Sequence, residues 1–244
     1  MLVSLLNDVI GPVMRGPSSS HCAAALRIGR LTLDLMGGDL TSVLVEYDRQ
    51  GSLATTHESQ GSDMGLLGGL LGWEATDERL PDSPLLIREA GIDVRTEITD
   101  TGDDHPNTYR LTVGNTREHH TVVAVSTGGG MVEIIEIDGV SLSVCGDYWE
   151  TLVWVEGTTD LALRSLTCPL AADEVLTHAQ GAGHLLQIKA QHPMLDEHLA
   201  ALPGTVVRMR RLAPILPVLS RRAVAVPFST CDEMLAGDGD RDSP

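Results

Sequence analysis

The first residues that could do chemistry follow a stretch with two glycines and two prolines, residues 11–17. Three hydroxyls and an imidazole come directly after it, in Ser18, Ser19, Ser20 and His21. The alanine- and leucine-rich run that begins there predicts a helix from Ser18 to about Met36, because proline is excluded from a helix interior. Ser18 would be the N-cap, and the free N–H groups of a helix N-terminus can bind a carboxylate or phosphate. A capped helix would explain one serine; three serines and a histidine favour a small-anion site.

A second polar stretch, residues 50–63, contains His57 and ends in Gln60, Gly61, Ser62 and Asp63. Its composition predicts an irregular surface loop, and loops of about fourteen residues are usually functional or disordered. The apolar, glycine-rich residues 64–72 predict a buried helix whose glycines allow close backbone approach. Ser62 or Asp63 would cap this helix, so the polar loop would end at a second helix N-terminus.

Two weaker motifs occur further along the chain. The polar residues 100–108 form a loop with a His-Pro-Asn motif, which contributes His105 and Asn107. This motif is also ordinary turn chemistry. Ser126 then precedes three consecutive glycines, Gly128, Gly129 and Gly130. Three glycines suit a kink or bulge in a sheet as well as they suit direct contact with a ligand.

The elements that must position these residues are mostly strands. Residues rich in β-branched side chains predict six strands, at 41–47, 94–98, 109–113, 121–125, 131–137 and 140–144. A short helix is expected at 81–90, and Asp138-Gly139 predicts a tight hairpin turn. We therefore expect residues 1–147 to form one α+β domain with mixed strands and helices.

Beyond residue 147 the order of elements changes. Predicted strands at 151–155 and 205–211, a hairpin within 174–191, and helices at 161–166 and 194–202 give the order βαββαβ. This order is ferredoxin-like. We expect the second domain to span residues 151–215 and the tail, residues 216–244, to be mostly disordered.

The composition restricts the class of protein. Asp and Glu outnumber Lys and Arg by 34 to 17, which gives a formal net charge of −17 and predicts no binding to nucleic acid or an anionic membrane. No apolar run reaches the roughly 18 residues of a membrane-spanning helix, and the N-terminus has no signal-peptide pattern. The four cysteines are far apart and match no disulfide or zinc pattern: Cys22, Cys145, Cys168 and Cys231. We expect a cytoplasmic protein with free thiols.

Four segments of the first domain follow one another in an order and spacing that can be compared with known families. They are Gly16 to His21 with Arg27 to Arg30, Gly51 to Ala54 leading to Gly61 to Asp63, His105 to Asn107, and Ser126 to Gly130. In this order and spacing they resemble the beta subunit of the iron–sulfur-dependent L-serine dehydratases, over residues 1–147. Residues 151–215 resemble, more loosely, the ACT domain that follows in two-subunit members.

The resemblance implies a subunit of an L-serine ammonia-lyase, which converts L-serine to pyruvate and ammonia. In this family a [4Fe-4S] cluster activates the substrate hydroxyl, and its cysteine ligands lie on the alpha subunit. The chain is expected to be inactive without an alpha partner, to form a homo- or hetero-oligomer, and to hold no metal itself. The resemblance places the following residues near the substrate: Ser18, Ser19, Ser20, Gln60, Gly61, Ser62, Asp63, His105, Asn107, Gly128, Gly129 and Gly130.

One position departs from the family. The family loop reads Gly-His-Gly-Thr-Asp, and its histidine is the favoured general base, but this chain has Gln60 there. Glutamine cannot accept a proton near neutral pH. His21 and His57 remain as candidate catalytic bases. The alternative hypothesis is a regulatory module that binds serine or a hydroxy acid without catalysis. Residues 156–160 match the effector-binding turn of ACT domains only in part, so an oligomerisation module is an equally good interpretation of the second domain.

Overall fold

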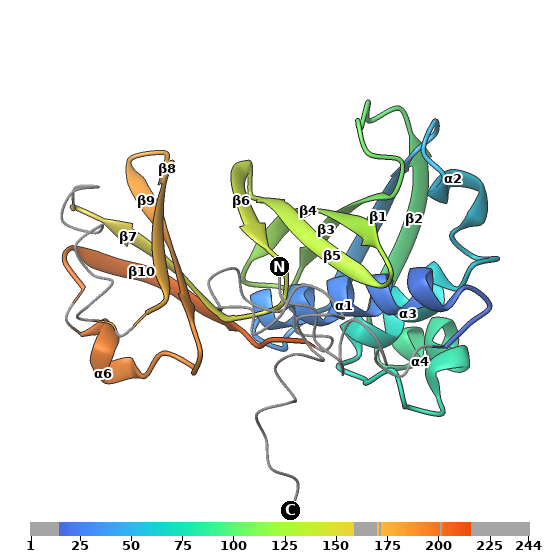
Figure 1. The fold of residues 1–244 in the computed structure, drawn as a ribbon, viewed down its shortest axis with the longest axis horizontal. Coiled ribbons are helices and arrows are strands. Elements are labelled where there is room, and N and C mark those ends of the chain that lie inside the picture. Colours follow the sequence, from blue (N-terminus) through green and yellow to red (C-terminus); the bar gives the residue numbers. More distant parts are fainter. Residues whose placement is uncertain (1–14, 159–169, 171, 201, 216–244) are drawn as a thin grey trace, which may run out of the picture.

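The computed structural model describes residues 15–158, 170, 172–200 and 202–215. Two β-sheets and a few helices make up this part of the chain (Figure 1), which confirms the α+β class. The predicted tail at 216–244 and the predicted helix at 161–166 lie outside the described residues. No described helix is both long enough and apolar enough to cross a membrane.

The first sheet has six strands in the order β2-β1-β3-β4-β5-β6. Their bounds are β1 Ser42–Asp48, β2 Asp93–Thr99, β3 Thr108–Gly114, β4 His119–Gly128, β5 Met131–Ile137 and β6 Val140–Val144. β1 and β2 are parallel, and the other neighbours are antiparallel. All six predicted strands are confirmed, as is the turn after β5, where Asp138 and Gly139 both have positive φ.

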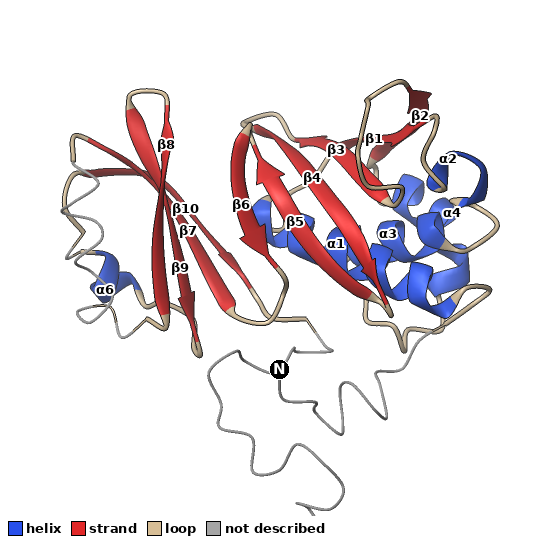
Figure 2. Ribbon diagram, turned by 45° about the horizontal axis from the view of Figure 1, so that its top comes forward, coloured by secondary structure: helices blue, strands red, loops and turns tan. Residues whose placement is uncertain are grey.

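Helices cover one face of this sheet (Figure 2). They are α1 Ser19–Leu35, α2 Leu53–Thr56, α3 Ser62–Leu70 and α4 Ser83–Glu89, the last preceded by a 3-10 turn at Leu80–Asp82. Gly37, with a φ of 63°, follows α1, as its sequence predicts. The prediction of an irregular loop over residues 50–63 is wrong, because α2 and the start of α3 lie within it. A helix of four residues is too short to show a hydrophobic period in the sequence.

α1 and α3 pack against each other through a seam of small residues. A methyl group at Gly65 would lie 2.1 Å from the carbonyl oxygen of Cys22, and one at Gly69 would lie 2.2 Å from that of Leu26. Only glycine allows the two backbones to approach this closely. The contacts advance in the same direction along both chains, so the two helices are parallel and their N-termini lie at the same end.

The second sheet has four antiparallel strands in the order β10-β7-β9-β8. They are β7 Trp149–Glu156, β8 Glu174–Gln180, β9 Gly183–Ala190 and β10 Thr205–Leu212. The strands and their hairpin agree with the predicted pattern. The helix predicted at 194–202 is shorter than expected, a single turn, α6 Asp196–Leu199. The ACT-like assignment of this sheet stays a prediction.

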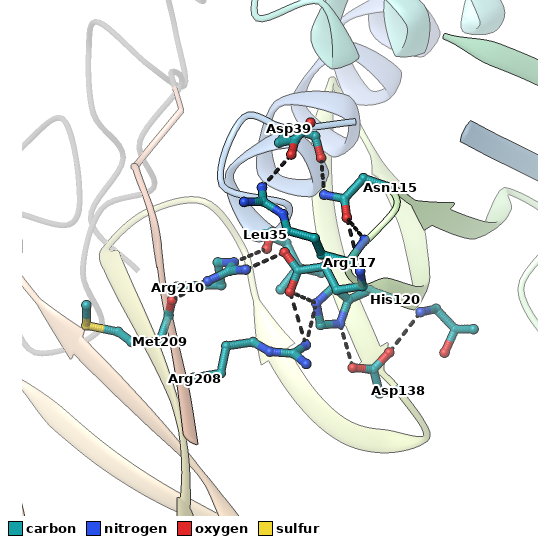
Figure 3. Close-up of polar contacts among 11 residues, drawn as sticks. Leu35, Asp39, Asn115, Arg117, His120, Asp138, Arg208, Met209 and Arg210 are labelled. Atoms are coloured by element: carbon teal, nitrogen blue, oxygen red, sulfur yellow. Dashed lines mark hydrogen bonds and ion pairs between the residues drawn. The ribbon is translucent and has the colours of Figure 1, made fainter. Parts of the chain in front are cut away.

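A polar network joins the two sheets at one end (Figure 3). Arg210 on β10 donates from Nε to the carbonyl oxygen of Leu35 in α1, at 2.8 Å, and from Nη2 to Glu118. Arg208 donates from Nη1 to Nε2 of the fully buried His120, at 2.8 Å. His120 Nδ1 lies 2.6 Å from Asp138 Oδ2. β10 is thereby tied to α1, β4 and the β5–β6 turn.

A buried ion pair within the second sheet lies beside a further connection to the first sheet. Glu150 on β7 and Lys189 on β9 are 2.7 Å apart, and Gln187 also donates to Glu150, at 3.0 Å. Lys189 and Gln187 both donate to the carbonyl oxygen of Ser143 on β6, each at 2.8 Å. Four apolar residues of the second half belong to the same buried cluster as the first sheet: Leu152, Leu185, Leu212 and Ile215. The two sheets therefore share part of one core, and other residues of the second sheet form a separate buried cluster.

Candidate functional site

The N-terminus of α1 carries the serine–histidine motif. Ser18 is at the N-cap, as predicted, but its side chain does not cap the helix. Its Oγ lies 2.7 Å from Nδ1 of His21, and its backbone N–H donates to the carbonyl oxygen of Gln60, at 3.2 Å. Ser19 is exposed, while Ser20 and His21 are half-buried. The side chains of the first turn thus remain available at the helix end.

The N-terminus of α3 lies beside that of α1. Gly61, with a φ of 78°, is the N-cap, and Ser62 and Asp63 are the first helical residues, so the predicted cap at Ser62 or Asp63 is wrong by one or two positions. A left-handed cap position favours glycine over either residue. Ser62 is buried, and Gln60 Oε1 is buried without a hydrogen bond to any described residue. Two positive dipole ends meet here, which favours an anion.

The turn before α3 places the side chain of His57 in contact with that of Asp63. The backbone N–H groups of Ser62 and Asp63 both donate to the carbonyl oxygen of His57. His57 Nδ1 lies 2.7 Å from Asp63 Oδ2, and Tyr47 at the end of β1 donates its hydroxyl to Asp63 Oδ1, at 3.2 Å. The rings of Tyr47 and His57 are 5.0 Å apart between centroids. These contacts form a connected Tyr47–Asp63–His57 triad.

A hollow of about 520 Å³ opens beside this triad. His57, Gly61 and Asp63 line one end, together with Pro17. The rest of the lining comes mainly from apolar residues of α3, α4 and β2, including Met64, Leu67, Ile87 and Val94. The hollow brings the turn of residues 57–63 together with the start of the α1 motif. Its lining does not include Ser18, Ser19, Ser20, Gln60, Ser62, His21, His105, Asn107 or the three glycines.

The His-Pro-Asn motif is held in a turn. His105 Nδ1 accepts the backbone N–H of Asn107, at 3.2 Å. Ser52, directly before α2, donates its hydroxyl to Asn107 Oδ1 and its N–H to the carbonyl oxygen of Pro106. The Asn107 carbonyl oxygen accepts the N–H of Ser126. The motif therefore joins three of the segments that the sequence analysis singled out.

Asp48 shapes this loop, although its role was not predicted from the sequence. Asp48, at the end of β1, accepts the N–H of Gln50 at Oδ1 and three hydrogen bonds from Thr101, Gly102 and Asp103 at Oδ2. These bonds stabilise the carboxylate, the one from Gln50 most, and lower the pKa of Asp48 to about 2. Tyr47 was missed as well. The only sequence signal for both is a Tyr-Asp pair between a strand and a polar stretch.

The three glycines form the turn between β4 and β5. Gly128 pairs with Met131, and the register shifts between Ser126 and Gly128, which is the bulge that the sequence allows. Gly129 and Gly130, with φ of 60° and 82°, occupy the turn. Their backbone geometry is explained by the hairpin. Direct contact between these glycines and a ligand stays a prediction.

The described cysteines do not suit an iron–sulfur cluster. Burial raises the pKa of Cys22 to about 11 and also raises the pKa of Cys145, so the thiolate that a cluster needs is disfavoured at both positions. Both thiols are free. Glu58 approaches His57 and Asp63, with potential ligand atoms within 4.8 Å of one another. The hydrogen bond between His57 and Asp63 accounts for the position of these two side chains without a metal ion.

Comparison with known proteins found two curated relatives. The chain is 38% identical over 146 residues to the probable L-serine dehydratase beta chain of Bacillus subtilis (strain 168), which covers 60% of this chain and 66% of the relative. It is 35% identical over 143 residues to the L-serine dehydratase beta chain of Peptoniphilus asaccharolyticus, which covers 58% and 64%. The chain thus spans slightly less than two thirds of each relative. No protein-family model matches it. Over the aligned region the chain is homologous to the beta chains of L-serine dehydratases, as its motifs predict.

Proposed function

We propose that the chain is the beta subunit of an L-serine ammonia-lyase, which forms pyruvate and ammonia together with an alpha subunit. The observation that carries this proposal is the meeting of two parallel helix N-termini, one with the serine–histidine motif and one beside the Tyr47–Asp63–His57 triad. The names of the two relatives support it. The proposed location is the cytoplasm, where the thiols of Cys22 and Cys145 stay reduced.

In this proposal the chain supplies substrate contacts and a base. The N–H groups in the first turn of α1, with Ser18, Ser19 and Ser20, hold the carboxylate of L-serine. His57 takes the α-proton, and His21, in contact with Ser18 Oγ, helps to bind the substrate. From the family resemblance we assign the [4Fe-4S] cluster to the alpha subunit. The pocket is then completed only when the two subunits meet.

The test is anaerobic co-expression with a serine-dehydratase alpha subunit, followed by an assay for pyruvate from L-serine. We expect turnover by the pair and none by this chain alone. An intact cluster without turnover would contradict the proposal. His21→Ala should raise KM for L-serine several-fold, whereas His119→Ala, at an exposed position outside the site, should not. Equal KM values for the two variants would show that His21 does not contribute to substrate binding.

One observation favours a second function. Gln60 stands where the family has its favoured base, so the chain could instead be a regulatory module that binds serine or a hydroxy acid. Calorimetric titration of the chain with L-serine separates the two hypotheses. Binding to the chain alone, with no turnover in the presence of an alpha subunit and an intact cluster, would support the regulatory module.

A further inference from the structure

The three side chains of the Tyr47–Asp63–His57 triad are held by more contacts than substrate binding alone would require. The His57 side chain is only 15% exposed, that of Asp63 22% exposed, and Tyr47 is fully buried. Both carboxylate oxygens of Asp63 have a partner, Oδ1 the hydroxyl of Tyr47 and Oδ2 the Nδ1 of His57. Tyr47 also packs edge-on against Tyr109, with centroids 5.6 Å apart. The carboxylate is therefore held from both sides.

These contacts fix where the protons lie. Burial raises the pKa of Tyr47 well above its ordinary value, and Tyr109 and Asp63 raise it further, so Tyr47 keeps its proton and donates it to Oδ1. A carboxylate can only accept, so the short contact at Oδ2 requires a proton on Nδ1 of His57. In the neutral imidazole the other nitrogen, Nε2, then carries a free lone pair.

We propose that Asp63 and Tyr47 are positioning residues, which hold His57 in its Nδ1–H tautomer so that Nε2 replaces the base missing at Gln60. This inference rests on the proposed function. Nε2 accepts the proton from the substrate Cα, and the electron pair of that C–H bond forms the Cα–Cβ double bond as hydroxide leaves Cβ. The proton then passes from Nε2 to the hydroxide to give water. Asp63 stabilises the imidazolium formed between these steps.

The first test measures the tautomer directly on the full chain. Long-range ¹H–¹⁵N spectra of histidine-labelled protein at alkaline pH distinguish the two ring nitrogens, and His57→Gln assigns the signals. We expect a protonated Nδ1 and an unprotonated Nε2 at His57. Asp63→Asn should give a mixture of both tautomers, while Asp93→Asn, at an exposed position on β2, should change nothing. A wild-type His57 protonated at Nε2 would overturn the inference.

The second test separates positioning from packing. Tyr47→Phe keeps the ring and removes the hydroxyl from Asp63, so kcat with the alpha subunit should fall about three- to tenfold with little change in KM. Tyr109→Phe is the matched control, since Tyr109 is equally buried but its hydroxyl makes no hydrogen bond to a described residue. An equal fall in both variants would show that Tyr47 acts through packing alone and would refute its positioning role.

Failure of the proposed function and failure of the inference about His57 give different results. If the alpha subunit and this chain give no turnover of L-serine, the proposed function fails, but the tautomer spectra still decide whether Asp63 and Tyr47 orient His57. If the pair is active and His57→Gln retains full kcat, the ammonia-lyase activity stands, but the role of His57 as its base and this inference are wrong. Loss of His57 should lower kcat by about 10² to 10⁴.

Discussion

At the residue scale, the position of His57 depends on a short turn. His57 and Asp63 are six positions apart in the sequence, yet both the Ser62 and Asp63 N–H groups donate to the His57 carbonyl oxygen. The turn places the two side chains in contact where α3 begins. Residues 57 and 60 thus belong to the same turn, and His57 is a titratable residue of that turn that lines the hollow beside the triad.

A rescue experiment tests this exchange of positions. His57→Gln should lower kcat for L-serine about a hundredfold or more. Adding Gln60→His to that variant should restore much of the lost rate, because it returns the base to the family position. Gln60→His alone should change kcat little, since His57 already accepts the proton. A large gain from Gln60→His alone would mean that His57 is not the working base.

At the element scale, the seam between α1 and α3 sets the geometry of the site. Parallel helices place like dipole ends side by side, which is unfavourable without a negative charge nearby. Asp63 in the first turn of α3 offsets part of this cost. The contact of Gly65 with the backbone of α1 keeps the two N-termini close enough for Ser18 to donate to Gln60.

Gly65→Ala should separate the two helices. Its new methyl group would meet the Cys22 carbonyl oxygen, a backbone atom that cannot rotate away, so we expect a loss of about 1–3 kcal/mol in the free energy of unfolding. Gly68→Ala on the same helix is the control, because its methyl group meets the flexible end of the Leu80 side chain. The free energies of unfolding are measured in urea. An equal loss in both variants would show that the close contact at Gly65 is not required for the packing of α1 on α3.

Asp48 stabilises the loop that carries His105 and Asn107, and it does so in a pH-dependent way. Its pKa is about 2 when folded and near 3.8 when unfolded, so below about pH 4 the unfolded state binds more protons. Stability from Asp48 is therefore complete above pH 4 and is lost as the pH falls toward 2. Asp48→Asn should make urea unfolding less dependent on pH in this range. Asp100→Asn, in an exposed pair with Arg49, should leave the pH dependence as in wild type.

Local patterns in the sequence predicted the elements well and their contacts poorly. Elements that depend on neighbouring residues were predicted correctly. They are α1 with the glycine that ends it, the Asp138-Gly139 turn and the β8–β9 hairpin. Contacts between distant residues leave no such pattern. Tyr47 with Asp63 and Asp48 with residues 101–103 could not be predicted, because no periodicity links β1 to these turns.

At the scale of the whole molecule, the chain passes from the first sheet to the second between β6 and β7, and part of the core is common to both sheets. The predicted domain boundary near residue 147 stays a prediction. Arg210 and Arg208 reach from β10 to α1 and β4, and Lys189 and Gln187 reach from β9 to β6. Glu150 is fully buried between these strands. Burial raises the pKa of Glu150, and the ammonium of Lys189 opposes that rise.

Removing one partner of this buried pair should be costly. Glu150→Gln leaves the Lys189 charge without its counterion, and we expect the free energy of unfolding to fall by about 3–5 kcal/mol. Glu74→Gln breaks an exposed pair with Arg30 and should cost about 1 kcal/mol or less. Similar losses in the two variants would show that the buried Glu150–Lys189 pair contributes no more to stability than an exposed pair.

The contacts of Glu118 and His120 with arginines have a consequence for comparing related sequences. Both side chains face arginines that only the second sheet supplies. In a relative that ends after β6, the same positions would be open to water and free to change to any polar residue. An acidic residue at 118 followed by a histidine at 120 should therefore occur together with arginines at 208 and 210, which makes this quartet a signature of chains that carry the second sheet.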